Sequence, residues 1–331
     1  MNNDFKRFWA WPDELAQSGI LGINRRNVGF IFEHNPRHLY PRVDNKLKTK
    51  EICEACGILV PETYGVLQEH SDCRRFLQII GDRSEFVVKP ASGAAGRGII
   101  VVARRAGNTF YTSGDREITW SDLRYHLSTI LSGLYSLGGQ LDQVIVERRI
   151  VSHPLLMSIA VEGTPDVRVV IYRGVPVMAM IRLSTTRSEG RANLHQGAVA
   201  AAVDLETGVT YGGVCENRAI THHPDTKQPL TGIEIPSWHE LLDAAMRTSD
   251  ALGMGYVGVD FVIDINMGPV VLEANARPGL SIQLAHGRGM LPRLAFVDSL
   301  AEEMRVGQRR WELLSRLAKL SAAPTLGVPS D

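Results

Sequence analysis

Short apolar runs separated by polar, glycine-containing stretches make up most of the chain. Runs of about four to eight apolar, β-branched residues between turn residues are typical of buried strands. In the first half of the chain they predict strands at 63–67, 85–90, 99–104 and 143–149. Positions with helical spacing predict helices at 44–56, near 71–80 and at 120–137.

The first of these helices has recognisable start and stop signals. Asp44 is the expected N-cap, because its side-chain oxygen can accept a hydrogen bond from a free N–H of the first turn. Leu47, Ile52 and Ala55 form the expected apolar stripe. Gly57 is expected to end the helix.

Pairs of strand-like runs in the second half predict two β-hairpins. The pairs are 166–173 with 176–183, and 255–264 with 268–275. A polar loop is expected at 184–194, a further strand at 198–205 and an amphipathic helix at 237–253. A long helical C-terminus is expected after the second hairpin. This mixture of hairpins and helices favours an α+β architecture over a regular alternation of strands and helices.

Composition and charge narrow the choice of function. A chain of 331 residues allows about two domains. Lys plus Arg and Asp plus Glu are equal, at 36 each, so the bulk positive field of a non-specific nucleic-acid binder is missing. Four cysteines are too few for a disulfide framework. With no signal-peptide pattern and no membrane-spanning apolar run, we expect a cytoplasmic protein that neither binds nucleic acid nor spans a membrane.

The second hairpin carries the most specific chemical signal. If its strands pair around a two-residue turn, Asp260 lies opposite Glu273, with Cβ atoms about 4.5–5.5 Å apart, and Asn275 projects to the same side. Directly opposed carboxylates destabilise a sheet unless a cation lies between them. Such oxygen ligands suit Mg²⁺ holding nucleotide phosphates. A solvated sheet face is the alternative interpretation, and a longer turn through Gly268 is the alternative register.

A glycine-rich loop, ASGAAGRG at 91–98, follows Lys89 at the end of an apolar strand. Small residues let backbone N–H groups approach phosphate oxygens, which Lys89 can neutralise. The loop residues expected at the nucleotide are Ser92, Gly93, Gly96 and Gly98. No GK[ST] follows, and the next segment reads as a strand, so neither a P-loop nor a dinucleotide fingerprint is present. Taken alone, the loop is better explained as an ordinary glycine-rich turn of a hairpin.

Further cations lie elsewhere in the sequence. Lys46 can reach the same phosphates from the start of its helix, with a solvated lysine as the alternative interpretation. The end of the first hairpin and the loop that follows it are crowded with cations and amides, which indicates anion binding. These residues are Arg182, Arg187, Arg191, Asn193 and His195.

Taken in order, these motifs resemble the ATP-grasp superfamily, and most closely the RimK-type α-L-glutamate ligases, from about Asp44 to Gly279. The matching segments are Asp44-Asn45-Lys46, Lys89 with its loop, the hinge strand VIVERR, Asp166-Val167-Arg168, Arg191 to Ala198, Gly258-Val259-Asp260 and Glu273 to Leu280. The family's amino-terminal domain is replaced here by about 43 residues. Arg277 stands where the ribosomal ligases usually have a small residue.

The resemblance implies an α+β ATP-grasp fold in which two α+β subdomains grip ATP between them. It divides the chain into an N-terminal cap (1–43), a first subdomain with the glycine-rich lid (44–147), a second subdomain with the metal and catalytic site (148–320) and a flexible tail (321–331).

It also implies an ATP- and Mg²⁺-dependent carboxylate–amine ligase that forms an amide or peptide bond through an acyl phosphate, similar to α-L-glutamate ligases. One or two Mg²⁺ ions are expected, with Mn²⁺ as an alternative. The resemblance implies that Asp260, Glu273 and Asn275 bind the metal and that Lys46 and Lys89 bind the phosphates. Around the nucleoside it implies Glu147, Arg148, Arg149 and Ile150 at the adenine, mainly through backbone groups, and Asp166 near the ribose. Arg182, Arg191 and Asn193 are implied at the transferred phosphoryl group, and Arg277 at a substrate carboxylate.

The expected substrates are an amino-acid or peptide carboxylate and an amine, with a protein acceptor as an alternative. Two other interpretations stay open. One is an ATP-grasp ligase for a different acid and amine, such as a D-Ala–D-Ala-like enzyme. The other is a non-catalytic ATP-binding subunit of a partner complex. A protein or sugar kinase is disfavoured, because no H-R-D or D-F-G segment is present.

Overall fold

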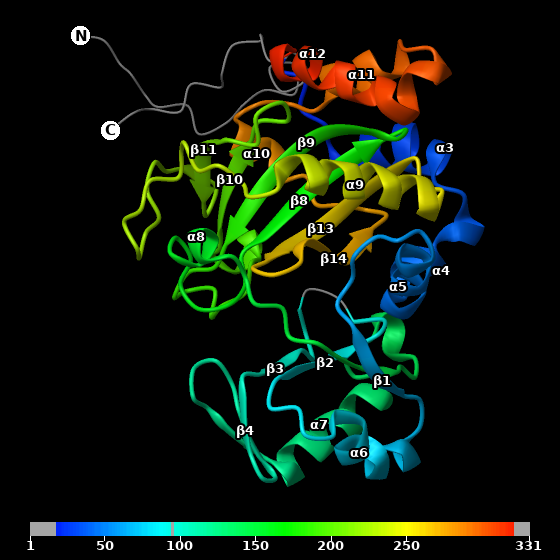
Figure 1. Ribbon diagram of the computed structural model, residues 1–331. Helices are drawn as coiled ribbons and strands as arrows, with labels where there is room; N and C mark the ends of the chain where they lie inside the picture. Colours follow the sequence, from blue (N-terminus) through cyan, green and yellow to red (C-terminus); the bar gives the residue numbers. More distant parts are fainter. Residues whose placement is uncertain (1–17, 94–95, 321–331) are drawn as a thin grey trace.

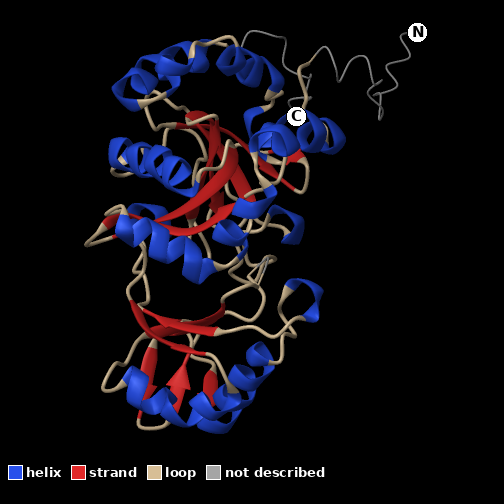
Figure 2. Cartoon of the chain, turned by 90° about the vertical axis from the view of Figure 1, so that its right-hand side faces the viewer, coloured by secondary structure: helices blue, strands red, loops and turns tan. Residues whose placement is uncertain are grey.

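The computed structural model describes residues 18–93 and 96–320, which form two bodies, each built on antiparallel strands (Figure 1). The larger body has a seven-stranded sheet of order β12-β11-β10-β9-β8-β13-β14. The smaller body has a four-stranded sheet, β1-β7-β2-β3, and a three-stranded sheet, β4-β5-β6. Each body has its own apolar core. Figure 2 shows the two bodies one above the other, which confirms the α+β class.

The central strands of the larger sheet are covered on both faces. All nine residues of β13 are buried, which is expected of a strand with a layer on each side. Helix α9 (Trp238–Leu252) packs on β8, β9, β13 and β14, and α10 (Ile282–His286) packs on β9, β10 and β11. The strands are β8 (Asp166–Tyr172), β9 (Val175–Leu183), β10 (Val199–Val203), β11 (Thr210–Cys215), β12 (Arg218–Ala219), β13 (Tyr256–Asp264) and β14 (Gly268–Asn275).

Both predicted hairpins are confirmed. Arg173 and Gly174 connect β8 to β9, and both have positive φ angles, as the tight hairpin turns require. In the β13–β14 hairpin Asp260 pairs with Glu273, as predicted. The turn is one residue longer than the two-residue version, but an irregularity between Asp260 and Phe261 offsets the difference, so the predicted register holds at the site.

The smaller body contains the four strands predicted in the first half of the chain. Their bounds are β1 (Thr63–Leu67), β2 (Phe86–Pro90), β3 (Ile100–Val102) and β7 (Val144–Glu147), and the three-stranded sheet adds β4 (Arg104–Ala106), β5 (Thr109–Tyr111) and β6 (Glu117–Thr119). Segment η3 (His70–Arg75), α6 (Phe76–Ile80) and α7 (Trp120–Leu131) complete the body. Helix α7 ends before the predicted residue 137, because Gly133 turns the chain with a φ of +80°.

Short helices near the N-terminus pack on the larger body. Asn35 exchanges two hydrogen bonds with the backbone of Tyr256, at 2.7 and 2.8 Å. The helices are α2 (Ile23–Arg26), the π-helix η1 (Asn27–Ile31), α3 (Phe32–His34), η2 (Arg37–Leu39) and α4 (Pro41–Asp44). The first 17 residues of the predicted cap and the whole predicted tail, 321–331, lie outside the described residues.

Helix α5 (Lys46–Ala55) differs from its sequence prediction in two respects. Its N-cap is Asn45, whose side chain accepts hydrogen bonds from Leu47 N and Lys48 N, and Asp44 instead ends the preceding helix. The predicted apolar stripe is only partly correct: Ile52 is half-buried against the core, but Ala55 is exposed. The fully buried positions are Thr49, Lys50 and Cys53. This face packs toward α9 and β14, so α5 lies with the larger body, beside the junction of the two (Figure 1). The subdomain boundaries at 44 and 147 stay predictions.

The C-terminal region is helical, as predicted, but it consists of several short helices rather than one continuous helix. Gly287 and Gly307 have positive φ angles and interrupt it. The remaining helices and turns are η4 (Leu137–Gly139), α8 (Pro154–Met157), η5 (Leu194–Gln196), α11 (Leu291–Asp298), η6 (Glu302–Arg305), η7 (Gly307–Leu313) and α12 (Leu314–Lys319). Within residues 18–93 and 96–320, every helix is too short or too polar to span a bilayer.

Replacing the N-cap of α5 tests the local assignment. We expect Asn45→Ala to lower the free energy of unfolding by about 1 kcal/mol, because two N–H groups lose their acceptor. The control is Asp44→Ala, which should change that free energy by less than about 0.5 kcal/mol. Urea unfolding measures both. A larger loss in the Asp44 variant would contradict the assignment.

Candidate active site

A chain of buried ion pairs crosses β9, β8 and β13 of the larger sheet. Arg168 donates to both oxygens of Asp260 at 2.6 Å, from Nε and Nη2. Arg182 donates to Asp260 Oδ2 at 2.9 Å and to both oxygens of Asp166, at 2.5 and 2.9 Å. Arg168 lies opposite Asp260 in the sheet, and Arg182 lies opposite Asp166. Arg168 was not among the predicted site residues, although it belongs to the matched segment Asp166-Val167-Arg168.

The two carboxylates respond differently to this setting. Burial raises the pKa of Asp166, and its one arginine partner, Arg182, only partly offsets that increase, while the neighbouring Asp260 adds to it. Burial also acts to raise the pKa of Asp260, but Arg168 and Arg182 together lower it below its ordinary value. Asp260 is therefore ionised and held by two guanidinium groups.

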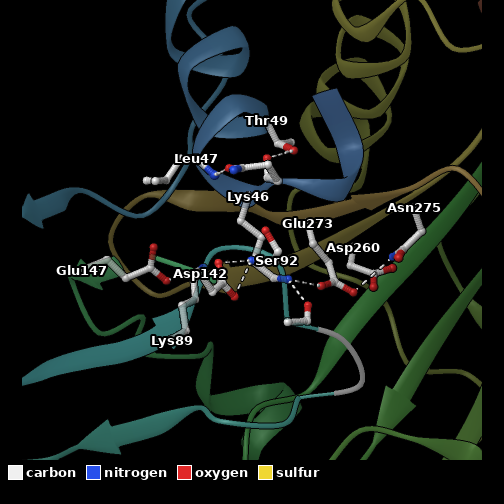
Figure 3. A network of polar contacts seen from close by, with 12 residues as sticks. Lys46, Leu47, Thr49, Lys89, Ser92, Asp142, Glu147, Asp260, Glu273 and Asn275 are labelled. Atoms are coloured by element: carbon white, nitrogen blue, oxygen red, sulfur yellow. Dashed lines mark hydrogen bonds and ion pairs between the residues drawn. The ribbon is translucent and has the colours of Figure 1, made fainter. Parts of the chain in front are cut away.

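Glu273 and Asn275, both on β14, lie beside Asp260 of β13 (Figure 3). The Asn275 amide donates to Glu273 Oε1 at 3.1 Å, and the Glu273 side chain is 34% exposed. Among the described residues, no three His, Cys, Asp or Glu side chains are grouped to hold a metal by themselves. A carboxylate and an amide oxygen on partly exposed side chains instead fit a Mg²⁺ ion whose other ligands are phosphate and water. Asp260 fits only if an arginine releases one of its oxygens.

Lys46 connects this pair to the glycine-rich loop. Its Nζ donates to Gly93 O at 2.5 Å and lies 3.7 Å from Glu273 Oε2. Its backbone N–H donates to Ala91 O at 2.9 Å. Burial lowers the pKa of Lys46, and Lys89 acts in the same direction, while Glu273 and Asp142 oppose them. The predicted phosphate lysine and the predicted metal ligand are thus brought together (Figure 3).

The start of the glycine-rich loop is held by Asp142, which the sequence analysis missed. Both carboxylate oxygens accept from Ser92 N, at 3.0 and 3.1 Å, and one accepts from the Ser136 hydroxyl at 2.9 Å. Gly98 has a φ of +77°, and a Cβ there would lie 2.6 Å from the Tyr135 ring, so this position requires glycine. Gly96 also has a positive φ. Ala94 and Ala95, in the middle of the loop, lie outside the described residues.

A second buried group of charges lies on the smaller sheet. The carboxylate of Glu147 accepts from Lys89 Nζ at 2.5 Å through one oxygen and from Lys50 Nζ at 2.6 Å through the other. All three side chains are at most 6% exposed. Glu147 was expected from the sequence to lie beside the adenine, mainly through its backbone groups. Lys50 was not among the predicted site residues. No local signal identifies Lys50, because its partner lies 97 positions away.

The predicted hinge residues occupy the chain segment that leaves the smaller sheet. Arg148 N donates to Glu62 O at 2.8 Å. The Arg149 guanidinium lies 3.3 Å from Glu85 Oε1. Ile150 is partly exposed in the same segment. The backbone from 147 to 150 therefore lies at the junction, and its contact with adenine stays a prediction.

Arg191, Asn193 and Arg277 are not joined to these groups by any hydrogen bond or ion pair among the described residues. Arg191 is exposed and lies 3.6 Å from Glu189. Asn193 caps a short turn, with its side chain accepting from His195 N. Arg277 is exposed, with its guanidinium 5.2 Å from the centre of the Tyr40 ring. Their expected contacts with phosphate or substrate stay predictions.

Removing Arg182 tests the ion-pair chain. We expect Arg182→Met to lower the free energy of unfolding by about 3 kcal/mol, because two buried carboxylates lose a shared partner. In the folded protein the pKa of Asp166 lies above its ordinary value, so the folded state binds a proton at this carboxyl more tightly than the unfolded chain does. Protonation therefore stabilises the folded state. The loss should therefore be larger at about pH 8 than at about pH 5.

Arg187 provides the matched control. It pairs with Glu216 on the surface and its side chain is 73% exposed. Arg187→Met should cost less than about 1 kcal/mol at either pH. Urea unfolding at the two pH values measures both variants. A loss in the Arg182 variant that is small or independent of pH would contradict the account of the ion-pair chain.

Comparisons with known proteins bear on the family of this chain. A family model described as sugar-transfer associated ATP-grasp matches residues 25–299. The probable α-L-glutamate ligase of Halorhodospira halophila is 24% identical over 249 residues, which cover 75% of this chain and 60% of the relative. The protein of that name from Xanthomonas oryzae pv. oryzae is 27% identical over 267 residues, or 80% and 68% of the two chains. This chain thus spans only about three fifths to two thirds of their length.

Solved structures of similar proteins include the ATP-grasp ligase PsnB complexed with minimal precursor. Its TM-score is 0.44 at 15% identity, and the alignment covers 82% of this chain and 64% of that one. D-alanine–D-alanine ligase from Bacillus anthracis complexed with ATP has a TM-score of 0.43 at 17% identity, covering 85% and 69%. The family model spans most of the described chain, and the ATP-grasp resemblance is confirmed. The chain belongs to the sugar-transfer associated ATP-grasp family.

Proposed function

We propose that this protein is an ATP- and Mg²⁺-dependent carboxylate–amine ligase that forms an amide bond and releases ADP. The observation that carries the proposal is the position of Lys46, which contacts the glycine-rich loop through Gly93 and the acidic hairpin through Glu273. A polyphosphate between those two elements would meet backbone N–H groups on one side and oxygen ligands for a cation on the other. Membership of the ATP-grasp family supports the same interpretation.

The residues divide into groups with separate tasks. Lys46 and Lys89 would neutralise the phosphates, and the loop from Ser92 would present its N–H groups to them. Glu273 and Asn275 would hold Mg²⁺, with Asp260 joining them once an arginine turns from it to a phosphate. Bound there, Mg²⁺ would supply charge neutralisation for the transferred phosphoryl group.

The chemistry proposed for the site has two steps. A substrate carboxylate oxygen attacks the γ-phosphorus, the bond to the β-γ bridging oxygen breaks, and ADP leaves behind an acyl phosphate. An amine then attacks the acyl carbon, loses a proton and displaces inorganic phosphate, which gives the amide. Such transfers depend mainly on positioning and on neutralising charge. Arg168 and Arg182 are the cations best placed beside Asp260 to stabilise the phosphoryl group, and Arg191 and Asn193 are proposed to reach it from their loop.

The substrate class rests on the relatives. Proteins named probable α-L-glutamate ligase suggest an amino acid or peptide as carboxylate and amine, with a protein acceptor as the alternative. The family that matches this chain is described as associated with sugar transfer. An amine or carboxylate carried on a sugar therefore belongs in any substrate screen.

A second candidate function is a nucleotide-binding protein without ligase activity. The observation in its favour is Asp260, whose two oxygens are both held by arginines. Tight binding of Mg-ATP without ADP release, for every pool of acids and amines, would support this alternative.

Changing Glu273 tests the metal site of the proposed ligase. We expect Glu273→Gln to reduce ADP release by at least about a hundredfold, because one charged oxygen of the Mg²⁺ site is lost. The far-ultraviolet circular dichroism spectrum should stay unchanged. ADP release is measured with pools of amino acids, peptides and amino sugars, and the products are identified by mass spectrometry.

Glu240→Gln is the matched control, because Glu240 is an exposed carboxylate in the first turn of α9 and has no assigned role in the site. It should retain the activity of the unchanged protein. Near-normal ADP release by the Glu273 variant would refute the assignment of this residue to the metal site.

A further inference from the structure

Lys50 is a buried lysine on α5 that the proposed chemistry does not use. Its side chain is 5% exposed, and its Nζ donates to Glu147 Oε2 and to Pro61 O, each at 2.6 Å. Burial lowers the pKa of Lys50, Glu147 opposes that effect, and Lys89 adds to it. Placing an ammonium group here costs free energy, so it calls for an explanation beyond packing.

Both partners of Lys50 lie where the chain crosses between the two bodies. Pro61 precedes β1, on the first crossing, and Glu147 ends β7, just before the second. The crossings are themselves joined, since Arg148 N donates to Glu62 O at 2.8 Å. Helix α5 packs with the larger body, on α9 and β14. One side chain from the larger body therefore fixes both connections to the smaller one.

The charges of this group do not cancel. If Lys50 were absent, Lys89 and Glu147 would form an electrically neutral ion pair. The Glu147 carboxylate would then neutralise the ammonium charge of Lys89. With Lys50, two ammonium groups share one carboxylate, which leaves one net positive charge in a buried place. A buried excess charge attracts an ion of opposite sign more strongly than an exposed one does, because water screens it less.

We propose that Lys50 is a positioning residue of the nucleotide site, which occupies one oxygen of Glu147 and so leaves Lys89 with the charge to bind a polyphosphate. This inference rests on the proposed ATP site. It differs from a role in catalysis, because Lys50 acts through Glu147 and Lys89.

Binding of a non-hydrolysable ATP analogue, measured by calorimetry, tests the inference. Lys50→Met should weaken binding of the analogue by on the order of tenfold, and should weaken binding of AMP much less, because AMP has fewer charges near Lys89. Lys48→Met is the matched control, since Lys48 is exposed two positions earlier on the same helix, and it should bind as the unchanged protein does.

A second change distinguishes charge from folding. Adding Glu147→Gln to Lys50→Met leaves Lys89 unneutralised again, so the double variant should recover most of the lost affinity. Glu147→Gln alone should bind the analogue more tightly than the unchanged protein, because Lys89 and Lys50 both lose their counter-charge, and this gain keeps the test valid if the Lys50 variant does not fold. Unchanged affinity in Lys50→Met, or weak binding by either Glu147 variant, would overturn the inference. Absence of binding by the unchanged protein would overturn the proposed function as well.

Discussion

Ions removed from water must be paired, and this requirement organises the junction between the two bodies. Desolvating a carboxylate or ammonium group costs several kcal/mol, so such a group is stable in the interior only with an opposite charge in contact. Asp260 meets two arginines in the larger sheet, and Glu147 meets two lysines in the smaller one. Because the partners come from different elements, these pairs also fix the elements relative to one another.

The pairing is unequal on the two sides, and that inequality explains the proposed specificity. Beside the smaller sheet, Lys89 and Lys50, which comes from α5, exceed the single charge of Glu147, which suits an anionic phosphate chain. On the larger body, Glu273 remains partly exposed beside Asn275, which suits a cation. Lys46 spans the space between the two. A nucleotide polyphosphate with bound Mg²⁺ would place negative charge beside the lysines and positive charge beside Glu273. Membership of the ATP-grasp family accords with this interpretation.

Much of this could be predicted from local sequence. The two hairpins follow from apolar runs and turn residues, and the opposition of Asp260 and Glu273 was predicted from an assumed two-residue turn between their strands. That register held because an irregularity in the hairpin offset the longer turn. The features that could not be predicted depend on distant partners. Lys50 reads as a surface residue until β7 is placed beside it, and Asp142 gains its role only when the glycine-rich loop folds back to it.

The central claim is that Mg²⁺ and the phosphates of ATP bind between the glycine-rich loop and the β13–β14 hairpin. A crystal grown with a non-hydrolysable ATP analogue and Mn²⁺ in place of Mg²⁺ tests it most directly, because manganese is located by its anomalous scattering. The account predicts a manganese peak bonded to Glu273 and Asn275, with the phosphates against Lys46 and Lys89. A nucleotide bound elsewhere, or a hairpin without metal beside bound phosphates, would contradict it.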